Sequence, residues 1–483
     1  MQFDNTYYKL PPRFYANALP ARSSAPQLLK LNEPLAAQLG LDFNSLSQLE
    51  LSNIFSGNLV PAGSNPIALV YAGHQFGHFV PQLGDGRAIL LGEVVAPDGC
   101  RFDIQLKGSG VTDFSRNGDG RSALGPVIRE YILSEAMFHL GVPTTRSLAA
   151  TLSGDMVYRD RPLAGAILTR VASSHIRIGT FQYFAARGDT EGVQTLLDYA
   201  LLRHYPEIKN DNNAAALFLR QVAKAQISLV TQWMALGFIH GVMNTDNMTI
   251  SGETLDYGPC AFMDNFNFDQ VFSSIDQNGR YAYMNQGHIA LWNLTRLAEC
   301  LIPLAHPDQK TAVDIINQEL LLIPDLLKKT WGERMLQKLG LDNYRDEDEQ
   351  LIYAWLTYLQ SEQLDYTLSF RHLSQILASD EQNCLFKMTP EFKQFESIWR
   401  FRLKQQSLDL GQVKNSMESV NPVFIARNHQ VERAIKHAEQ GDLSIFRQLN
   451  QVLEKPFQEQ SEFEIFKRAP LPQERVRATF CGT

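Results

Sequence analysis

The chain has 483 residues, of which 44% are hydrophobic and 20% are charged. These proportions are typical of a globular protein with a large buried core, and they exclude a disordered or collagen-like chain. The 44 basic residues are outnumbered by 52 acidic ones, which gives a net charge of −8. An acidic surface argues against a protein that binds nucleic acid or anionic lipid over most of its area, but it leaves room for one local basic pocket.

The cysteines stand singly along the chain, with no C-x-x-C pair and no spacing typical of a zinc knuckle or a secreted disulfide framework. This pattern favours a reducing compartment. The first residues lack the basic and apolar regions of a secretory signal, and no apolar run is long enough to span a bilayer. We therefore expect a cytoplasmic protein with no membrane segment and no nucleic-acid partner.

The first 66 residues carry several prolines between short helical pieces, which predicts an arm that wraps over a larger body. From residue 67 to 125, short β-branched and apolar runs alternate with glycine-rich turns. The segments at 83–87 and 97–99 have the Gly and Asp residues of hairpin turns. We expect an antiparallel sheet here, with strands at 68–71, 87–93 and 101–106.

Gly125 and Pro126 open a helix that is predicted to run to residue 140, because apolar residues recur at helical spacing and Gly141 follows them. Strands are expected again at 147–152, 156–158 and 164–171. A helical pattern follows over 189–242, with one long helix at 214–237, and then a small hairpin at 248–256. Beyond residue 285 the predicted helices are 289–302, 311–329, 332–339, 347–362, 367–377, 392–405 and 431–439.

The predicted fold class is therefore α+β, with a lobe of sheet and helix followed by a helical lobe. We expect four parts along the chain. They are the arm at 1–66, the sheet lobe at 67–185, a second lobe at 186–330 and a helical extension at 331–483.

Two weak motifs are set aside. A G-x-G-x-x-A pattern begins at Gly118, but the residues before it are polar, and no acidic residue for a ribose follows about twenty positions later. His74 and His78 have the spacing of a zinc-binding helix, but the catalytic Glu is missing and neighbouring glycines disfavour that helix. A flexible loop and ordinary hydrogen-bonded histidines are the better interpretations. The sequence contains no P-loop motif.

The segment at 238–258 carries the most chemical information. Asn247 lies just before the predicted hairpin and Asp256 just after it, so their side chains would face each other across the turn. Carboxylate and amide oxygens are the hard ligands that Mg²⁺ needs when it bridges phosphate oxygens in phosphoryl or nucleotidyl transfer. We predict a metal pair at these two residues.

Lys107, at the end of a predicted strand, fits a pattern found in kinases, where such a lysine binds phosphates and is held by a glutamate on the next helix. Glu130 and Glu135 both lie on that helix, and periodicity alone leaves the choice between them open. The order along the chain also matches. A glycine-rich hairpin comes first, then the strand lysine, the helix glutamate, the loop asparagine and an Asp-aromatic-Gly triplet.

One position departs from the kinase pattern. In the motif His-x-Asp-x-x-x-x-Asn the aspartate accepts the proton of the substrate hydroxyl. His240 and Asn247 keep this spacing, but Val242 stands at the position of the aspartate and cannot accept a proton. Either the chain is an inactive kinase, or its base lies elsewhere, and Asp246 is the obvious replacement.

These motifs resemble those of the YdiU/selenoprotein O family of protein adenylyltransferases, which have a protein-kinase-like, two-lobed fold. The resemblance covers nearly the whole chain and points to the cysteine-containing bacterial members. It rests on long blocks in the same order: YAGHQFG at 71–77, QLGDGR at 82–87, LKGSG at 106–110, GDGR at 118–121, SEAM at 134–137, GVPTTR at 141–146 and residues 240–248.

The resemblance implies that AMP passes from a flipped ATP to a Ser, Thr or Tyr hydroxyl of a protein, with release of pyrophosphate. Use of UTP is left open, and a monomer is expected. Asp246 would be the catalytic base, and Asn247 and Asp256 would hold Mg²⁺ or Mn²⁺. The residues expected at the nucleotide are Gly84, Gly86, Arg87, Lys107, Asp119, Gly120, Glu130, Arg170, Arg177 and Asp256, with Glu130 paired to Lys107.

Two other functions stay open at this point. A kinase with Asp246 as its base would transfer the γ-phosphoryl group, whereas a non-catalytic pseudokinase scaffold, which Val242 favours, would only bind nucleotide. The family also has a cysteine or selenocysteine just before its end, where this chain has Cys481. A regulatory disulfide between Cys481 and Cys260 is one hypothesis for this thiol.

Overall fold

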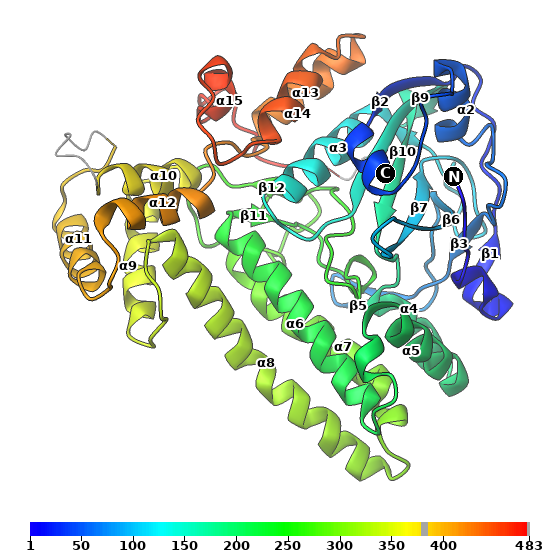
Figure 1. Ribbon diagram of the computed structural model, residues 1–483, viewed down its shortest axis with the longest axis horizontal. Helices are drawn as coiled ribbons and strands as arrows, with labels where there is room; N and C mark the ends of the chain where they lie inside the picture. Colours follow the sequence, from blue (N-terminus) through cyan, green and yellow to red (C-terminus); the bar gives the residue numbers. More distant parts are fainter. Residues whose placement is uncertain (378–384, 481–483) are drawn as a thin grey trace.

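The computed structural model of the protein describes residues 1–377 and 385–480. It is a mixed α+β structure, as the sequence predicts, and its strands pair in antiparallel register. In Figure 1 the main sheet lies on the right, long green helices run below it, and the C-terminal helices lie above and to the left.

The main sheet is built from strands that are far apart in the sequence. Its members are β1 (Tyr15–Asn17), β2 (Gln27–Leu31), β3 (Ile67–Leu69), β6 (Ala88–Val95), β7 (Arg101–Lys107), β8 (Ser122–Ala123), β9 (Arg146–Tyr158) and β10 (Pro162–Ala172). Their order is β1-β3-β6-β7-β10-β9-β2, and β8 pairs with β10. The predicted turn at 97–99 joins β6 to β7, with φ of +85° at Gly99, so this hairpin is confirmed.

The N-terminal segment supplies both edges of the sheet. β1 pairs with β3 at one edge, and β2 pairs with β9 at the other, where Gln27 lies opposite Leu152. The two strands have only three and five residues. Short strands at the edges limit the length of backbone that is open to pairing with another chain.

Helix α3 (Leu124–His139) packs against β9 and β10. It confirms the helix predicted after Gly125, and Gly141 beyond its end has φ of +77°. Its other side is covered by α13 (Asn428–Glu439) and α14 (Ser444–Leu453), which return to it from the far end of the chain (Figure 1). Polar side chains on such an enclosed helix are held rigidly by their surroundings.

Three long helices pack against one another below the sheet: α6 (Ala214–Ala235), α7 (Gln286–Ala305) and α8 (Gln309–Lys338) (Figure 1). The sequence predicts α6 correctly, but the predicted break at 330–331 is wrong, because α8 continues through it. A Cβ at Gly332 would lie 2.4 Å from the ring of Tyr344, so this glycine makes room for the ring and does not end the helix. The expected domain boundary at 330 therefore falls inside one helix.

Shorter helices complete the fold. They are α4 (Ile178–Ala185) and α5 (Thr190–His204) between the sheet and α6, then α9 (Asp348–Ser361), α10 (Tyr366–Gln375), α11 (Pro390–Leu403) and α12 (Leu410–Val420) at the left of Figure 1, and α15 (Glu464–Lys467) after α14. The sequence does not predict α4, α12 or α14. Within the described residues, no helix is long and apolar enough to cross a membrane.

Of three further local predictions, two are wrong and one is confirmed. β9 runs unbroken through 153–155, where two strands are predicted. The predicted hairpin at 248–256 is reduced to a single bridge between Met248 and Thr254, because the Thr249 hydroxyl takes backbone groups of Glu253 that a ladder would use. The histidine pair lies on the hairpin of β4 (Gly73–Gln75) and β5 (His78–Val80), so the exclusion of a zinc helix is confirmed.

Candidate functional site

Two neighbouring strands bring a lysine and an arginine together. Lys107 ends β7, and Arg170 lies on β10, which pairs with β7. Glu130 on α3 contacts both: its Oε2 lies 2.5 Å from Lys107 Nζ, and its Oε1 accepts a hydrogen bond from Arg170 Nε at 2.9 Å. Asp256 Oδ2 lies 2.7 Å from Lys107 Nζ and 3.4 Å from Arg170 Nη2. We call these four residues the Lys107 cluster.

Burial and charge act against each other in the Lys107 cluster. Burial alone would raise the pKa of Asp256, but the cations Lys107, Arg170 and Arg87 outweigh it and hold that pKa well below its usual range. Burial alone would lower the pKa of Arg170, but Glu130 and Asp256 hold it above its usual value. Asp256 and Arg170 therefore both stay charged at neutral pH.

The two glutamates of α3 have different partners. Glu130 faces Lys107, whereas Glu135 accepts hydrogen bonds from Arg146 Nε at 2.9 Å and from Asn32 Nδ2 at 2.7 Å. Glu135 thereby ties α3 to β9 and to the residue before α1 (Glu33–Gln38). The choice that periodicity leaves open is settled by these contacts in favour of Glu130.

Arg87 lies directly before β6, whose first residue Ala88 pairs with Lys107. Its positive charge contributes to lowering the pKa of Asp256. No carboxylate of the described residues forms an ion pair with it, and it lines the same cavity as Lys107. Its guanidinium is therefore available to an anionic ligand.

Arg177, at the start of α4, lies outside the Lys107 cluster. Its Nη2 donates to Asp85 Oδ1 at 3.0 Å, and its guanidinium carbon lies 3.9 Å from the centroid of the Tyr71 ring. Asp85 Oδ2 also accepts a hydrogen bond from Gln105 Nε2 at 3.2 Å. Arg177 thus holds the loop at 83–87 in place through Asp85.

Gly84 and Gly86 lie in that loop and pack against the segment at 112–115. A Cβ would lie 2.3 Å from the Phe114 ring if placed on Gly84, and 2.7 Å from the Phe114 carbonyl oxygen if placed on Gly86. Only glycine fits so close an approach. The prediction of a hairpin turn here is wrong, because the loop pairs back with β3, through Asp85 N and Leu69 O at 3.0 Å, before it enters β6.

Asp119 and Gly120 are placed beside the β9–β10 hairpin. Both oxygens of Asp119 accept hydrogen bonds from Arg159, at 2.8 and 3.0 Å, and these contacts lower the pKa of the carboxyl. Gly120 crosses Gly110 so closely that a Cβ would lie 2.0 Å from the Gly110 carbonyl oxygen. In this conformation neither residue has a contact with the Lys107 cluster among the described hydrogen bonds and ion pairs.

Asp246 is buried below the β4–β5 hairpin. Its Oδ2 accepts a hydrogen bond from Gln75 Nε2 at 3.2 Å, and its Oδ1 is buried with no hydrogen-bond partner in the described chain. Burial raises the pKa of Asp246 to about 6, although Gln75 and Arg177 both act to lower it. A carboxyl with this pKa and an unused oxygen can accept a proton near neutral pH.

The β4–β5 hairpin also fixes the loop that carries Asp246. The backbone nitrogen of His74 donates to Thr245 Oγ1 at 2.7 Å, and that of Phe76 donates to Asn244 Oδ1 at 3.1 Å. A Cβ on Gly73 would lie 2.7 Å from Asp246 Oδ1. The glycine therefore lets the hairpin approach the carboxylate closely.

Asn247 and Asp256 carry oxygen atoms of the kind that the sequence predicts for a metal. The Asn247 amide nitrogen donates to the Val242 carbonyl at 3.1 Å, which leaves its Oδ1 for another partner, and Asp256 stays ionised. An amide oxygen and a carboxylate suit Mg²⁺. Within the described residues there is no group of three or more His, Cys, Asp and Glu side chains that could hold a metal alone, so a bound ion would need further oxygens from its ligand.

A cavity of about 1,210 Å³ opens beside the Lys107 cluster. One part of its wall is made by Arg87, Lys107, Glu130 and Asp256. The other part comes from α13 and from residues 473–480, two segments that carry no sequence signal of a nucleotide site. Arg433, Lys436, Arg475 and Arg477 lie on this second part. No local motif marks them, because only the return of the C-terminal helices to α3 brings them here.

Comparison with known proteins identifies the family of this chain. A family model described as "Protein adenylyltransferase SelO" matches residues 1–454. The chain belongs to this family. "Protein nucleotidyltransferase YdiU" of Rhizobium etli (strain CIAT 652) is 52% identical over 487 residues, which cover 100% of this chain and 97% of the relative. The protein of that name from Bradyrhizobium diazoefficiens is 52% identical over 485 residues, which cover 100% of this chain and 99% of the relative. The one from Agrobacterium fabrum is 50% identical over 486 residues, which cover 100% of both chains.

Membership in the SelO family confirms the resemblance inferred from the motif blocks at 71–146 and 240–248. Cys481, where the family has its terminal cysteine or selenocysteine, lies outside the described residues. Thr479, two residues earlier, belongs to the described part of the chain. Its backbone nitrogen donates a hydrogen bond to Phe272 O at 2.8 Å, and its hydroxyl donates one to Pro259 O at 2.5 Å. Cys260 is buried next to this anchor.

Proposed function

We propose that the protein is a protein adenylyltransferase that transfers AMP from ATP to a Ser, Thr or Tyr hydroxyl of another protein and releases pyrophosphate, with UTP as a second candidate donor. The observation that carries this proposal is the ion-paired set of Lys107, Glu130 and Asp256 on the wall of a large cavity, with Arg170 buried behind them, in a chain that matches the SelO family model over residues 1–454. We further propose that it works as a monomer in the cytoplasm and does not bind nucleic acid.

The proposed architecture is a protein-kinase-like one, with the arm at 1–66, a sheet lobe at 67–185, a second lobe that begins at 186 and includes α8 to its end at Lys338, and the helical extension after it. The contacts of Lys107 support it. A strand lysine that pairs with a glutamate of the following helix, close to a loop aspartate, is the arrangement with which kinases bind ATP phosphates.

In this proposal Lys107, Arg170 and Arg87 bind the triphosphate, since Arg forks and Lys are suited to phosphate oxygens. Glu130 positions the first two. Gly84 and Gly86 allow close approach of the backbone to the nucleotide, and Asp119 and Gly120 belong to a loop that closes over it. Arg177 is already paired with Asp85, so we assign it to holding the loop at 83–87 for the ligand.

The metal ligands in this proposal are Asn247 and Asp256. Mg²⁺ or Mn²⁺ held there would neutralise negative charge that develops on the leaving pyrophosphate. In the transfer step, the acceptor oxygen forms a bond to the α-phosphorus, the bond from that phosphorus to the bridging oxygen breaks, and pyrophosphate leaves with the electron pair. The hydroxyl proton passes to the carboxylate of Asp246, whose pKa of about 6 keeps it mostly ionised at neutral pH.

Parallel incubations with α-labelled and γ-labelled ATP test the proposal. We expect acid-stable label on protein from α-labelled ATP alone, release of pyrophosphate, and loss of both in Asp256→Asn. Label from γ-labelled ATP alone would establish the kinase alternative. Binding of ATP without any transfer would establish the pseudokinase scaffold. Repeating the assay with α-labelled UTP decides whether UMP is transferred as well.

A further inference from the structure

The cavity continues beyond the Lys107 cluster into a second half that is formed by α13 and the C-terminal segment. That segment is held in place by Thr479, which pairs with Ser273 and bonds to Phe272 and Pro259. The cavity of about 1,210 Å³ exceeds the range of roughly 300–1,000 Å³ that is usual for small-molecule sites. There is therefore room for a second ligand beside a nucleotide.

Most acidic side chains of this second half are already paired. Glu432 lies 3.5 Å from Arg129, Glu439 lies 3.0 Å from Arg161, and Glu474 lies 2.5 Å from Arg468. Four cations on the same wall form no ion pair with any carboxylate of the described residues. They are Arg433, Lys436, Arg475 and Arg477, and we call them the basic wall.

The basic wall is accessible and lines the same cavity as Lys107 and Asp256. Lys436, Arg475 and Arg477 are exposed, and Arg433 is half-buried. The two pairs come from different elements, one from α13 and one from the chain after α15. Both line the cavity that also contains Lys107 and Asp256. A ligand on the basic wall would thus reach directly towards the place proposed for the nucleotide.

We propose that the basic wall binds an acidic segment of the protein that accepts AMP, next to the hydroxyl that is modified. This inference rests on the proposed function, because it names the class of acceptor for the same site. Four unpaired cations in one recess are complementary to a few Asp and Glu side chains, and such complementarity speeds encounter and selects partners.

A long nucleic acid is a weaker match to the same surface. Binding of nucleic acid relies on many phosphate contacts. The basic wall offers only four cations without a carboxylate partner among the described residues, and the chain as a whole has a net charge of −8. The nucleotide itself is accounted for by Lys107, Arg170 and Arg87. An acidic peptide segment fits both the limited number of cations and their place beside the nucleotide.

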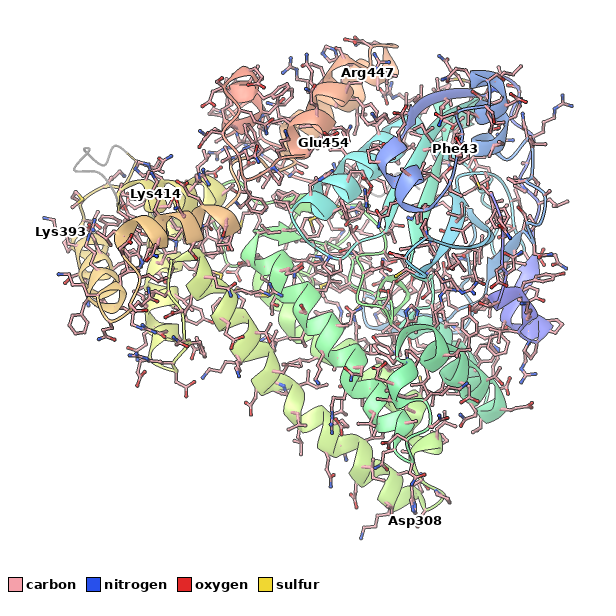
Figure 2. All side chains as sticks on the ribbon, in the orientation of Figure 1. Phe43, Asp308, Lys393, Lys414, Arg447 and Glu454 are labelled. Atoms are coloured by element: carbon pink, nitrogen blue, oxygen red, sulfur yellow. The ribbon has the colours of Figure 1, made fainter. Side chains whose placement is uncertain are left out.

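The test uses two acceptor peptides with the same single Tyr, one flanked by Glu and one by Gln. We measure kcat/KM for transfer of label from α-labelled ATP, and direct binding of each peptide by fluorescence anisotropy. The variant carries Arg433→Gln, Lys436→Gln, Arg475→Gln and Arg477→Gln. The control carries Lys393→Gln and Lys404→Gln, two exposed lysines of α11 and its C-terminal end. Figure 2 labels Lys393 at the far left, away from α13.

We expect the wild type to prefer the Glu peptide about tenfold, with the preference falling as salt is added, since exposed charge pairs contribute little each and are screened. The four-residue variant should lose this preference, while the control keeps it. Equal use of both peptides by the wild type, or a preference that survives in the variant, would overturn the inference.

Two outcomes separate this inference from the proposed function. If no peptide is labelled at all, the proposed function fails, and anisotropy still decides whether the basic wall binds the Glu peptide. If a short single-stranded RNA binds more tightly than the Glu peptide and the variant loses that binding, the surface belongs to nucleic acid and the inference is wrong.

Discussion

The side-chain amide of Gln75 donates a hydrogen bond to the carboxylate of Asp246, with 3.2 Å between Nε2 and Oδ2. The two residues are 171 positions apart, and the bond joins the β4–β5 hairpin to the loop of the proposed base. It is the largest of the influences that oppose the effect of burial on the pKa of Asp246. Gln75 therefore contacts this carboxylate directly and acts to lower its pKa against the effect of burial.

Replacing Gln75 by Leu is expected to shift the pH dependence of AMP transfer. Transfer needs ionised Asp246 and so declines as the pH falls through about 6. Loss of the donor raises that pKa further, so the acidic limb should move up by about one pH unit. The measurement is the initial rate against pH. Gln194→Leu, which removes another Gln-to-Asp hydrogen bond at an exposed site, should leave the profile in place.

Asp246→Asn should abolish transfer and yet stabilise the fold. The pKa of Asp246 is raised from the usual 3.8 to about 6, so the folded state binds this proton more tightly than the unfolded state does. Ionising the group therefore reduces stability, by about 3 kcal/mol once the pH is above 6. Denaturant unfolding should show a gain for the variant at pH 7.5 that disappears near pH 4. A gain that does not depend on pH would contradict this account.

The two glutamates of α3 form a matched pair for mutation. Glu130→Gln should reduce transfer by about 10²–10³, because it disturbs the cations that hold the triphosphate. Glu135→Gln should instead lower the unfolding midpoint, since Arg146 would lose its buried partner, with transfer per folded molecule little changed. Thermal unfolding and rates at saturating ATP distinguish the two. Equal losses of transfer rate in both variants would contradict the assignment of Glu130, and not Glu135, as the residue that positions the triphosphate-binding cations.

These glutamates also show how far sequence reasoning reaches. The helix could be predicted from its periodicity, as could α6 and the β6–β7 hairpin. The choice between Glu130 and Glu135 could not, because α3 is covered both by the sheet and by α13 and α14, and both residues are buried. Their roles depend on which cation faces them, Lys107 or Arg146, and that follows only from the pairing of distant strands.

Asn247→Ala is expected to raise the concentration of Mg²⁺ needed for half-maximal transfer by about tenfold, since one of two proposed oxygen ligands is lost. The maximal rate at saturating Mg²⁺ should fall less. A titration of the rate with Mg²⁺ at fixed ATP gives both values. Asn244→Ala is not a suitable control, because Asn244 forms hydrogen bonds with Phe76 and Tyr281. Asn450→Ala is a better control, because Asn450 is a partly buried residue of α14.

The basic wall marks the other limit of prediction from sequence. Arg475 and Arg477 lie in a segment without regular structure, and Arg433 and Lys436 look like an ordinary polar helix face. Only the packing of α13 on α3 gives them a common cavity with Lys107. In the same way, the break predicted at 330–331 fails because the ring of Tyr344, from a later segment, packs on Gly332.

The two edge strands have a consequence for synthesis on the ribosome. β1 can pair as soon as residues 67–69 have emerged, but β2 must wait for its partners at 149–152. This is roughly 120 residues after β2 itself is made, or about 6–24 s at 5–20 residues per second. Throughout that interval the nascent chain carries an unpaired strand, and crowded polysomes would be the place where neighbouring copies compete for it.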